Sequence, residues 1–288
     1  MTDELAQILN KDCFCIAVDK EELGHSLRAN LRESGLPEQL LGSDSHLFAD
    51  APVFLQQCHI EEMQRLINAV ENVARNAAYR DAVLANVPRS AQQNFGPAGV
   101  FFGYDFHLGD DGPQLIEINT NAGGTLLSLH LASAQQACCE QVTTFFGGKS
   151  SLADAEADLI AMFREEWNAQ RKNAALRTIA IVDEKPESQF LYHELLLFQS
   201  LFRRHGIEAV IADPADLRIE DDALYVGEQQ IDLVYNRLTD FYLETPESAC
   251  LLEAYQKGIA VLTPSPHVYA LYADKLNLPL LSDSDRLR

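Results

Sequence analysis

The sequence has little positive charge. Only 22 of its 288 residues are lysine or arginine, against 43 aspartates and glutamates, and its formal net charge is -21. The acidic residues are spread along the chain, and no basic cluster interrupts them. Because such a surface repels phosphate backbones and anionic lipid, we expect no nucleic acid and no membrane among its partners.

Disulfide patterns and long apolar runs are also missing. The six cysteines form no C-x-x-C pair, and Cys138 and Cys139 are adjacent. This pattern is typical of reduced, mostly buried thiols. The N-terminal MTDELAQILNKD has no apolar core of a signal peptide, and no run approaches a membrane-spanning length. The sequence therefore predicts a soluble cytoplasmic protein.

A complete P-loop is absent as well. Residues 147–150 read GGKS, but the motif requires a glycine where the chain has Thr143. The residues before it are patterned like a helix, whereas a P-loop follows a strand. We therefore do not expect a P-loop nucleotide site.

The chain is long enough, and at 47% hydrophobic residues apolar enough, to bury a sizeable core in one large or two modest domains. A polar linker at 173–176 separates two kinds of pattern. We expect a helical region with a hairpin in residues 1–172 and an α/β domain in residues 173–288. Apolar spacing predicts a helix over about 60–78 that covers the apolar face of the hairpin.

Residues 99–127, GVFFGYDFHLGDDGPQLIEINTNAGGTLL, alternate as two strands around a turn. Phe102, Tyr104, Phe106 and Leu108 share one face with Ile116 and Ile118. If residues 109–113 form the hairpin loop, Leu108 pairs with Gln114. Asp105 then lies directly opposite Glu117, and Asn119 follows on the same face.

Two carboxylates whose Cβ atoms lie about 5 Å apart repel each other unless a cation lies between them or one is protonated. Asp105, Glu117 and the amide oxygen of Asn119 form an all-oxygen set of the kind that Mg²⁺ prefers. The alternative is that these residues only face solvent. The following loop contains Gly123 and Gly124, whose backbone N–H groups are suited to bind an anion.

The second half alternates strands and helices. Buried strands are predicted at 178–184, 207–212, 232–236 and 259–263, and helices at 188–205 and 246–257. This pattern predicts a Rossmann-like parallel sheet, which binds ligands at the carboxyl ends of its strands. Arg237 follows one of these strands and suits bidentate recognition of a carboxylate or phosphate. A structural ion pair with Asp240 or Glu244 is the alternative.

The segment GYDFHLGDDGPQLIEINTNAGG resembles the metal-binding segment of ATP-grasp ligases. Because it precedes the Rossmann-like half, the order resembles the permuted arrangement of glutathionylspermidine synthase and eukaryotic glutathione synthetase. From about Pro52 onward the chain resembles an uncharacterised bacterial family of permuted ATP-grasp proteins, in segments that include IAIVDE, DLVYNRLTDFYLE and VLTPSPHVYALYADKLNLPLLSD. The implied fold is α/β, a partial ATP-grasp metal-binding hairpin region plus a Rossmann-like pre-ATP-grasp domain.

By position, the resemblance implies that Asp105, Glu117 and Asn119 bind Mg²⁺. It implies that the loop with Asn121, Gly123 and Gly124 faces the substrate carboxylate and the transferred phosphate of ATP. It also suggests an ATP-phosphate contact for Lys275. One departure is Gly103, where glutathionylspermidine synthases have an arginine, so their way of binding the thiol substrate does not transfer directly.

A larger departure follows the LLSD segment. The family continues there into a lysine and a glycine-rich loop that cover the phosphates, whereas this chain stops at Arg288 and has seven lysines, none in such a context. We therefore expect a truncated form, in which the metal platform lacks the cationic wall that neutralises charge in phosphoryl transfer.

The resemblance implies part of a Mg²⁺- and ATP-dependent carboxylate–amine or carboxylate–thiol ligase that works through an acyl phosphate. Arg237 would orient the substrate carboxylate. The expected partners are a small carboxylate, an amine or thiol co-substrate, and either a second copy of the chain or a protein that supplies the missing half. The alternatives are a non-enzymatic binding module for a small ligand or partner, and a purely structural hairpin.

Overall fold

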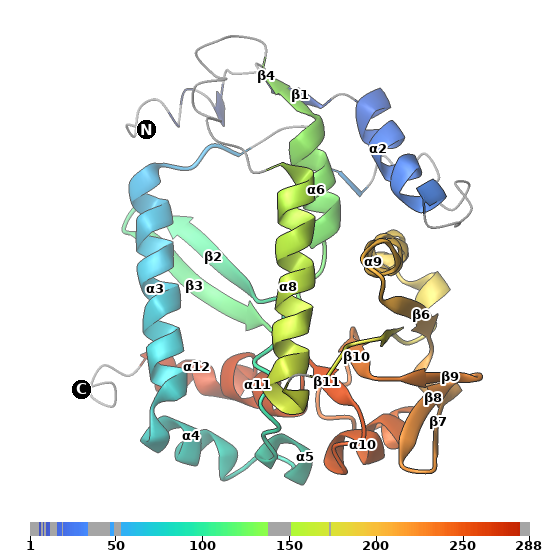
Figure 1. The fold of residues 1–288 in the computed structure, drawn as a ribbon. Coiled ribbons are helices and arrows are strands. Elements are labelled where there is room, and N and C mark those ends of the chain that lie inside the picture. Colours follow the sequence, from blue (N-terminus) through green and yellow to red (C-terminus); the bar gives the residue numbers. More distant parts are fainter. Residues whose placement is uncertain are drawn as a thin grey trace.

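A parallel sheet of four strands lies at the centre of the C-terminal half, in the order β11-β10-β5-β6 (Figure 1). The computed structural model of the chain describes residues 16–18, 20–33, 47–48, 53–137, 151–172 and 174–282 and the isolated positions 6, 8, 10 and 11.

The strands are β1 (Ile16–Val18), β2 (Gly103–Gly109), β3 (Gly112–Asn119), β4 (Gln135–Ala137), β5 (Thr178–Val182), β6 (Glu208–Ala212), β7 (Leu217–Glu220), β8 (Ala223–Val226), β9 (Gln229–Ile231), β10 (Leu233–Asn236) and β11 (Val261–Thr263). The helices are α2 (Lys20–Glu33), α3 (Gln57–Arg75), α4 (Ala77–Leu84), α5 (Arg89–Gln92), α6 (Thr125–Ala134), α8 (Leu152–Arg171), α9 (Tyr192–Arg204), α10 (Ala249–Gln256), α11 (Pro266–Tyr272) and α12 (Leu278–Ser282). The short 3₁₀ helices include η3 (Pro186–Ser188) and η6 (Lys275–Asn277).

Strand β5 has no polar face, because both faces of the sheet are covered. Ile179 and Ile181 point into a cluster that contains side chains of α8 and α9. Ala180 and Val182 point into a second cluster, which contains side chains of α10 and of the small antiparallel sheet β7-β8-β9. This burial explains the nearly continuous apolar run and confirms the predicted parallel sheet.

The order in which strands are added to the sheet reverses beside β5, although all four strands are parallel. Helix α9 connects β5 to β6 on one side, while β10 pairs with β5 on the other. The carboxyl ends of β5 and β10, occupied by Asp183 and Arg237, therefore form the switch point at which such sheets bind ligands.

Strands β2 and β3 form the predicted antiparallel hairpin, and α3 lies beside it (Figure 1). The Tyr104 hydroxyl donates a hydrogen bond to Glu71 of α3 at 3.3 Å. Helix α3 ends at Arg75 because Asn76 turns the chain, and the Asn76 side chain then caps α4 by accepting from the N–H groups of Ala78 and Tyr79. The predicted helix over 60–78 is confirmed with an earlier end.

Aromatic packing joins the start of the hairpin to the parallel sheet. The ring of Phe101 lies 5.5 Å from that of Phe198 and 5.9 Å from that of Tyr235. Phe101 and Leu126 belong to the same buried cluster as Ile179 and Phe198. The residues before and after the predicted boundary at 173 thus share a core, and the division into two domains stays a prediction.

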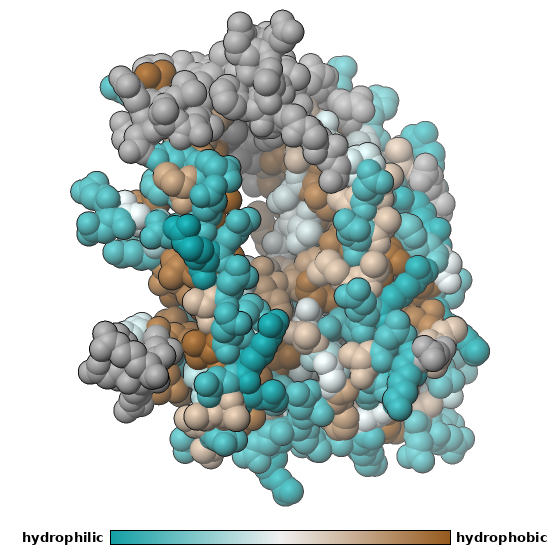
Figure 2. Space-filling view, turned by 60° about the vertical axis from the view of Figure 1, so that its left-hand side comes forward, coloured by the Kyte–Doolittle hydropathy of each residue, from teal (hydrophilic) through white to brown (hydrophobic). Residues whose placement is uncertain are grey.

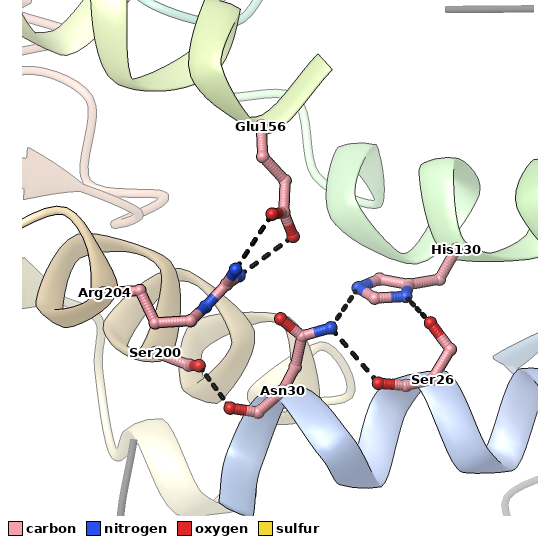
Figure 3. A network of polar contacts seen from close by, with 6 residues as sticks. All are labelled: Ser26, Asn30, His130, Glu156, Ser200 and Arg204. Atoms are coloured by element: carbon pink, nitrogen blue, oxygen red, sulfur yellow. Dashed lines mark hydrogen bonds and ion pairs between the residues drawn. The ribbon is translucent and has the colours of Figure 1, made fainter. Parts of the chain in front are cut away.

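A buried polar network connects α2, α6, α8 and α9 (Figure 3). His130 of α6 contacts Ser26 at 2.9 Å through Nδ1 and Asn30 at 3.5 Å through Nε2. Arg204 donates two hydrogen bonds to Glu156, at 2.9 and 3.0 Å. Since the Asn30 amide nitrogen is a donor, Nε2 accepts and Nδ1–H donates to Ser26, which gives His130 a structural role.

In the middle of the chain, α6 ends at Ala134, and residues 135–137 form β4, which pairs with β1. Residues 138–150, including the GGKS segment, lie outside the described residues. Of the cysteines, Cys58 is exposed and Cys250 is partly buried; both are free thiols, and the other four lie outside the described residues.

Candidate functional site

The hairpin places Asp105 directly opposite Glu117, as predicted, but for a different reason. Gly109 pairs with Gly112, so the turn contains two residues rather than five, and Leu108 pairs with Pro113 rather than Gln114. A bulge then shifts the register between Asp105 and Phe106. The short turn and the bulge offset each other, and the two acids meet.

The bulge also changes which side chains share a face. Phe106 pairs with Leu115, which therefore lies on the apolar face with Tyr104 and Ile118. Ile116, expected on that face, is the extra residue of the bulge and is 51% exposed. The expected apolar position of Ile116 was wrong because the alternation breaks at the bulge.

Four of the predicted site residues lie together: the three predicted metal ligands of the hairpin and Lys275. The ammonium of Lys275 lies 2.9 Å from Glu117 Oε2, and the Asn119 amide donates to Glu117 Oε1 at 3.1 Å. The hydrogen bond and positive charge of Lys275, and then the bond from Asn119, lower the pKa of Glu117. Glu117 therefore stays ionised opposite Asp105.

The backbone around Lys275 is held by its neighbour Asp274. The Asp274 carboxylate accepts the N–H of Leu276 at 3.0 Å, which caps η6, and accepts the hydroxyl of Tyr242 at 2.6 Å. Lys275 was predicted to contact phosphate, and the structure places it at the hairpin acids. Its side chain is 75% exposed, so the ammonium has room to move.

A buried carboxylate from α9 binds backbone amides of the loop that follows the hairpin. Glu194, only 1% exposed, accepts the N–H of Gly124 at 2.7 Å and that of Leu126 at 3.1 Å. Burial raises the pKa of Glu194, and the Gly124 hydrogen bond and the charge of Arg237 partly oppose that rise. One of the loop amides that the sequence suggested for an anionic ligand, that of Gly124, thus already binds an internal carboxylate, together with the Leu126 amide at the start of α6.

Sequence reasoning missed Glu194. Its only signal is an acidic side chain next to the apolar run LLLF in a helix whose pattern predicts burial. A carboxylate in such a position must find partners, because an unpaired buried charge is costly.

Arg237, at the end of β10, donates hydrogen bonds to the same loop. Its Nη1 donates to the carbonyl of Ala122 at 3.0 Å and also to that of Asn121. The Arg237 side chain is buried, and its Nε has no hydrogen-bond partner. The alternative pairing with Asp240 is wrong as a hydrogen-bonded contact, because that carboxylate binds the N–H groups of Glu244 and Thr245.

The Asn121 side chain makes a further hydrogen bond between the loop and the residues that follow β10. Its amide donates to the carbonyl of Leu238 at 3.1 Å. At the other end of the hairpin, the carboxylate of Glu166 accepts the N–H groups of Ala98 and Gly99, both at 2.8 Å. Buried charged groups thus anchor both the entry and the exit of the hairpin.

Asp183 lies at the end of β5, beside this loop. Burial raises its pKa to about 6, and a hydrogen bond from the Glu184 N–H and the charge of Arg237 limit the rise. A carboxyl group that titrates this close to neutrality is suited to exchange protons at the switch point.

Gly123 has no room for a side chain. A Cβ there would lie 2.5 Å from Leu191 Cδ1 and 2.6 Å from Arg237 Nη2. Gly123→Ala is therefore expected to lower the free energy of unfolding by about 1–3 kcal/mol, measured by chemical denaturation. Gly109→Ala is the matched control, since its Cβ would approach no atom closer than 3.8 Å. Equal stabilities for the two variants would contradict the tight packing.

The face that carries α3 and the hairpin is hydrophilic outside, with hydrophobic residues inside a central recess (Figure 2). Two surface pockets, of about 400 and about 350 Å³, lie near α3–α4 and near α5. None of the predicted site residues lines either pocket. The candidate site is the polar cluster at the hairpin, where Asp105, Glu117, Asn119 and Lys275 lie together.

Within the described residues, no group of three or more His, Cys, Asp or Glu side chains is placed to hold a metal ion. The hairpin set differs in kind, because its third oxygen donor is the amide of Asn119. No helix in the described part of the chain is long and apolar enough to cross a membrane.

No protein-family model matches the chain, and no curated protein matches it. Among solved structures, it is similar to a glutathione synthetase-like effector from Globodera pallida in its apo form, with a TM-score of 0.53 and 13% sequence identity. The match covers 92% of this chain and 66% of that chain, so the chain spans about two thirds of the length of its neighbour. At this identity the likeness concerns the fold alone: the chain has a mixed α/β fold similar to that of a glutathione synthetase-like protein.

Proposed function

We propose that this chain carries the metal-binding hairpin and the substrate-side sheet of an ATP-grasp carboxylate–amine or carboxylate–thiol ligase. The observation that carries the proposal is the pairing of Asp105 with Glu117, with Asn119 and the cation of Lys275 at the same place. A carboxylate that already pairs with a cation, directly opposite a second carboxylate, provides the oxygen donors and negative charge that a divalent metal requires.

Two of the three residues offer oxygen atoms to Mg²⁺ without rearrangement, and the third must rotate. Asp105 and Glu117 present carboxylate oxygens, whereas Asn119 now directs its amide nitrogen at Glu117 and must rotate to offer its oxygen. Bound Mg²⁺-ATP would supply the phosphoryl group that activates a substrate carboxylate for attack by the amine or thiol.

The chain's own contribution would be binding and orientation. Asp105, Glu117 and Asn119 would hold the cation, and Arg237 would keep the Asn121–Gly124 loop against the sheet, from where it could also orient a carboxylate. Asp183, half-buried with a raised pKa, would accept or release a proton near the same loop.

One observation favours the second candidate, a binding module without turnover. Glu194 occupies the amides of Gly124 and Leu126, so these donors do not stabilise developing negative charge on a substrate. A module of this kind would bind the metal–anion complex at the hairpin and transfer nothing.

Calorimetric titration of the chain with MgCl₂, alone and with ATP, tests the metal site. We expect Glu117→Gln to weaken binding at least about tenfold, because it removes one of two charged ligands. Asp111→Asn is the matched control: it removes the same charge from the exposed hairpin turn, away from the acid pair. Equal affinities of Glu117→Gln and the wild-type chain would exclude Glu117 from a metal site.

A second measurement separates the two candidate functions. Release of ADP in the presence of carboxylates and amines indicates a ligase, whereas binding without ADP release indicates a binding module.

A further inference from the structure

We infer that Lys275 is exchanged between Glu117 and an anionic ligand, so that a divalent cation and a phosphate-type polyanion strengthen each other's binding. This inference rests on the proposed function, because it concerns the same acid pair. It adds a coupling between the two ligands and names the residue that transmits the coupling.

The first step is that the carboxylate of Glu117 is engaged on both oxygens. Lys275 lies at Oε2 and the Asn119 amide at Oε1. A cation that binds between Asp105 and Glu117 must displace the Lys275 ammonium, because two positive charges bound to the same Glu117 carboxylate repel each other strongly. Free Mg²⁺ therefore competes with a group that the protein itself supplies.

The second step is that the ammonium can leave, while the backbone that carries it cannot. The Lys275 side chain is 75% exposed, but Asp274 caps η6 and is held by Tyr242. After displacement the ammonium remains within one side-chain length of the metal. It then repels a bare cation and attracts an anion.

The third step concerns the open positions of the metal. Mg²⁺ takes about six oxygen ligands, and the hairpin offers about three. A polyphosphate that fills the others brings negative charge next to the displaced Lys275. The anion thus removes the repulsion that opposes the bare metal, and binding of the two is coupled.

The test is one substitution that should change the affinities for Mg²⁺ and for a polyphosphate in opposite directions. Lys275→Gln is expected to bind free Mg²⁺ about 2–5-fold more tightly than the wild-type chain, because the competing charge is gone. The same variant is expected to bind inorganic tripolyphosphate, in excess Mg²⁺, at least about twofold more weakly. Both affinities are measured by calorimetry on the full chain.

Two variants control the measurement. Lys257→Gln removes another exposed lysine in an ion pair, 2.6 Å from Glu253, and is expected to leave both affinities unchanged. Lys275→Arg keeps the charge and is expected to retain the wild-type pattern. Circular dichroism verifies that each variant is folded.

The outcomes separate this inference from the proposed function. If Mg²⁺ binding depends on Glu117 but Lys275→Gln behaves like Lys257→Gln, the exchange is wrong and the metal site stands. If Lys275→Gln shifts both affinities in the same direction, Lys275 is not exchanged between two partners. If no Mg²⁺ binding depends on Glu117, with or without tripolyphosphate, both the metal site and the exchange are wrong.

Discussion

Replacing Glu194 with alanine is expected to lower the free energy of unfolding by about 2–6 kcal/mol, because each of two buried N–H donors that loses its acceptor costs about 1–3 kcal/mol. The carboxylate is 1% exposed and holds two backbone N–H groups at the start of α6. Its loss leaves those donors unpaired and removes the negative charge beside buried Arg237. Urea unfolding followed by circular dichroism measures the change.

Two further variants separate charge from packing. Glu194→Gln keeps the shape and one acceptor oxygen, so we expect a smaller loss than for alanine. Glu187→Ala removes an exposed carboxylate from η3, one element before α9, and is expected to change stability by less than about 0.5 kcal/mol. A loss below about 1 kcal/mol in Glu194→Ala would show that the loop does not depend on this carboxylate.

Acidification is expected to destabilise the protein through His130. Burial lowers the pKa of His130 from 6.5 to about 4, with Arg204 acting in the same direction and Glu156 opposing it. Between these two values the unfolded chain binds a proton that the folded chain excludes. The contribution is therefore fully favourable above pH 6.5 and is lost as the pH falls toward 4, by about 3 kcal/mol in total.

The measurement compares wild-type and His130→Gln chains by urea unfolding at pH 7.5, 6.5 and 5.5, which stays above the sequence pI of about 4.6. Asp183 acts in the opposite sense: its folded pKa of about 6 lies above its ordinary value of 3.8, so protonation favours the folded state as the pH falls through this range. The difference between the two chains isolates His130. We expect the wild-type chain to lose about 1 kcal/mol more than the variant between pH 7.5 and 5.5; parallel curves would mean that His130 titrates normally.

Local patterns predicted the elements well. The apolar run of β5 is a property of consecutive residues, and its burial confirms it. The alternation of β2 and β3 predicted both strands correctly, although it breaks at the bulge. The pairing of Asp105 with Glu117 was predicted correctly from an incorrect turn. The bulge could not be foreseen, because Ile116 fits an apolar strand position and only the turn geometry shows that it is extra.

Long-range contacts within the site were beyond sequence reasoning. Lys275 meets Glu117 across more than half of the chain, and nothing in the spacing of either residue indicates that contact. Glu194 was hidden for another reason: in front of the apolar run LLLF, one acid looks like an isolated exception until the loop amides that it binds are known. Arg237 was noticed for its charge, but its two backbone carbonyl partners follow only from the fold.

The bulge at Ile116 separates the tip of the hairpin from its base. On the tip side Phe106 pairs with Leu115, and on the base side Asp105 pairs with Glu117, with one extra residue of β3 between them. Deletion of Ile116 would join the two segments into a regular ladder, because both pairs then follow each other directly. This one residue can therefore be lost from strand β3 without moving Asp105 away from Glu117.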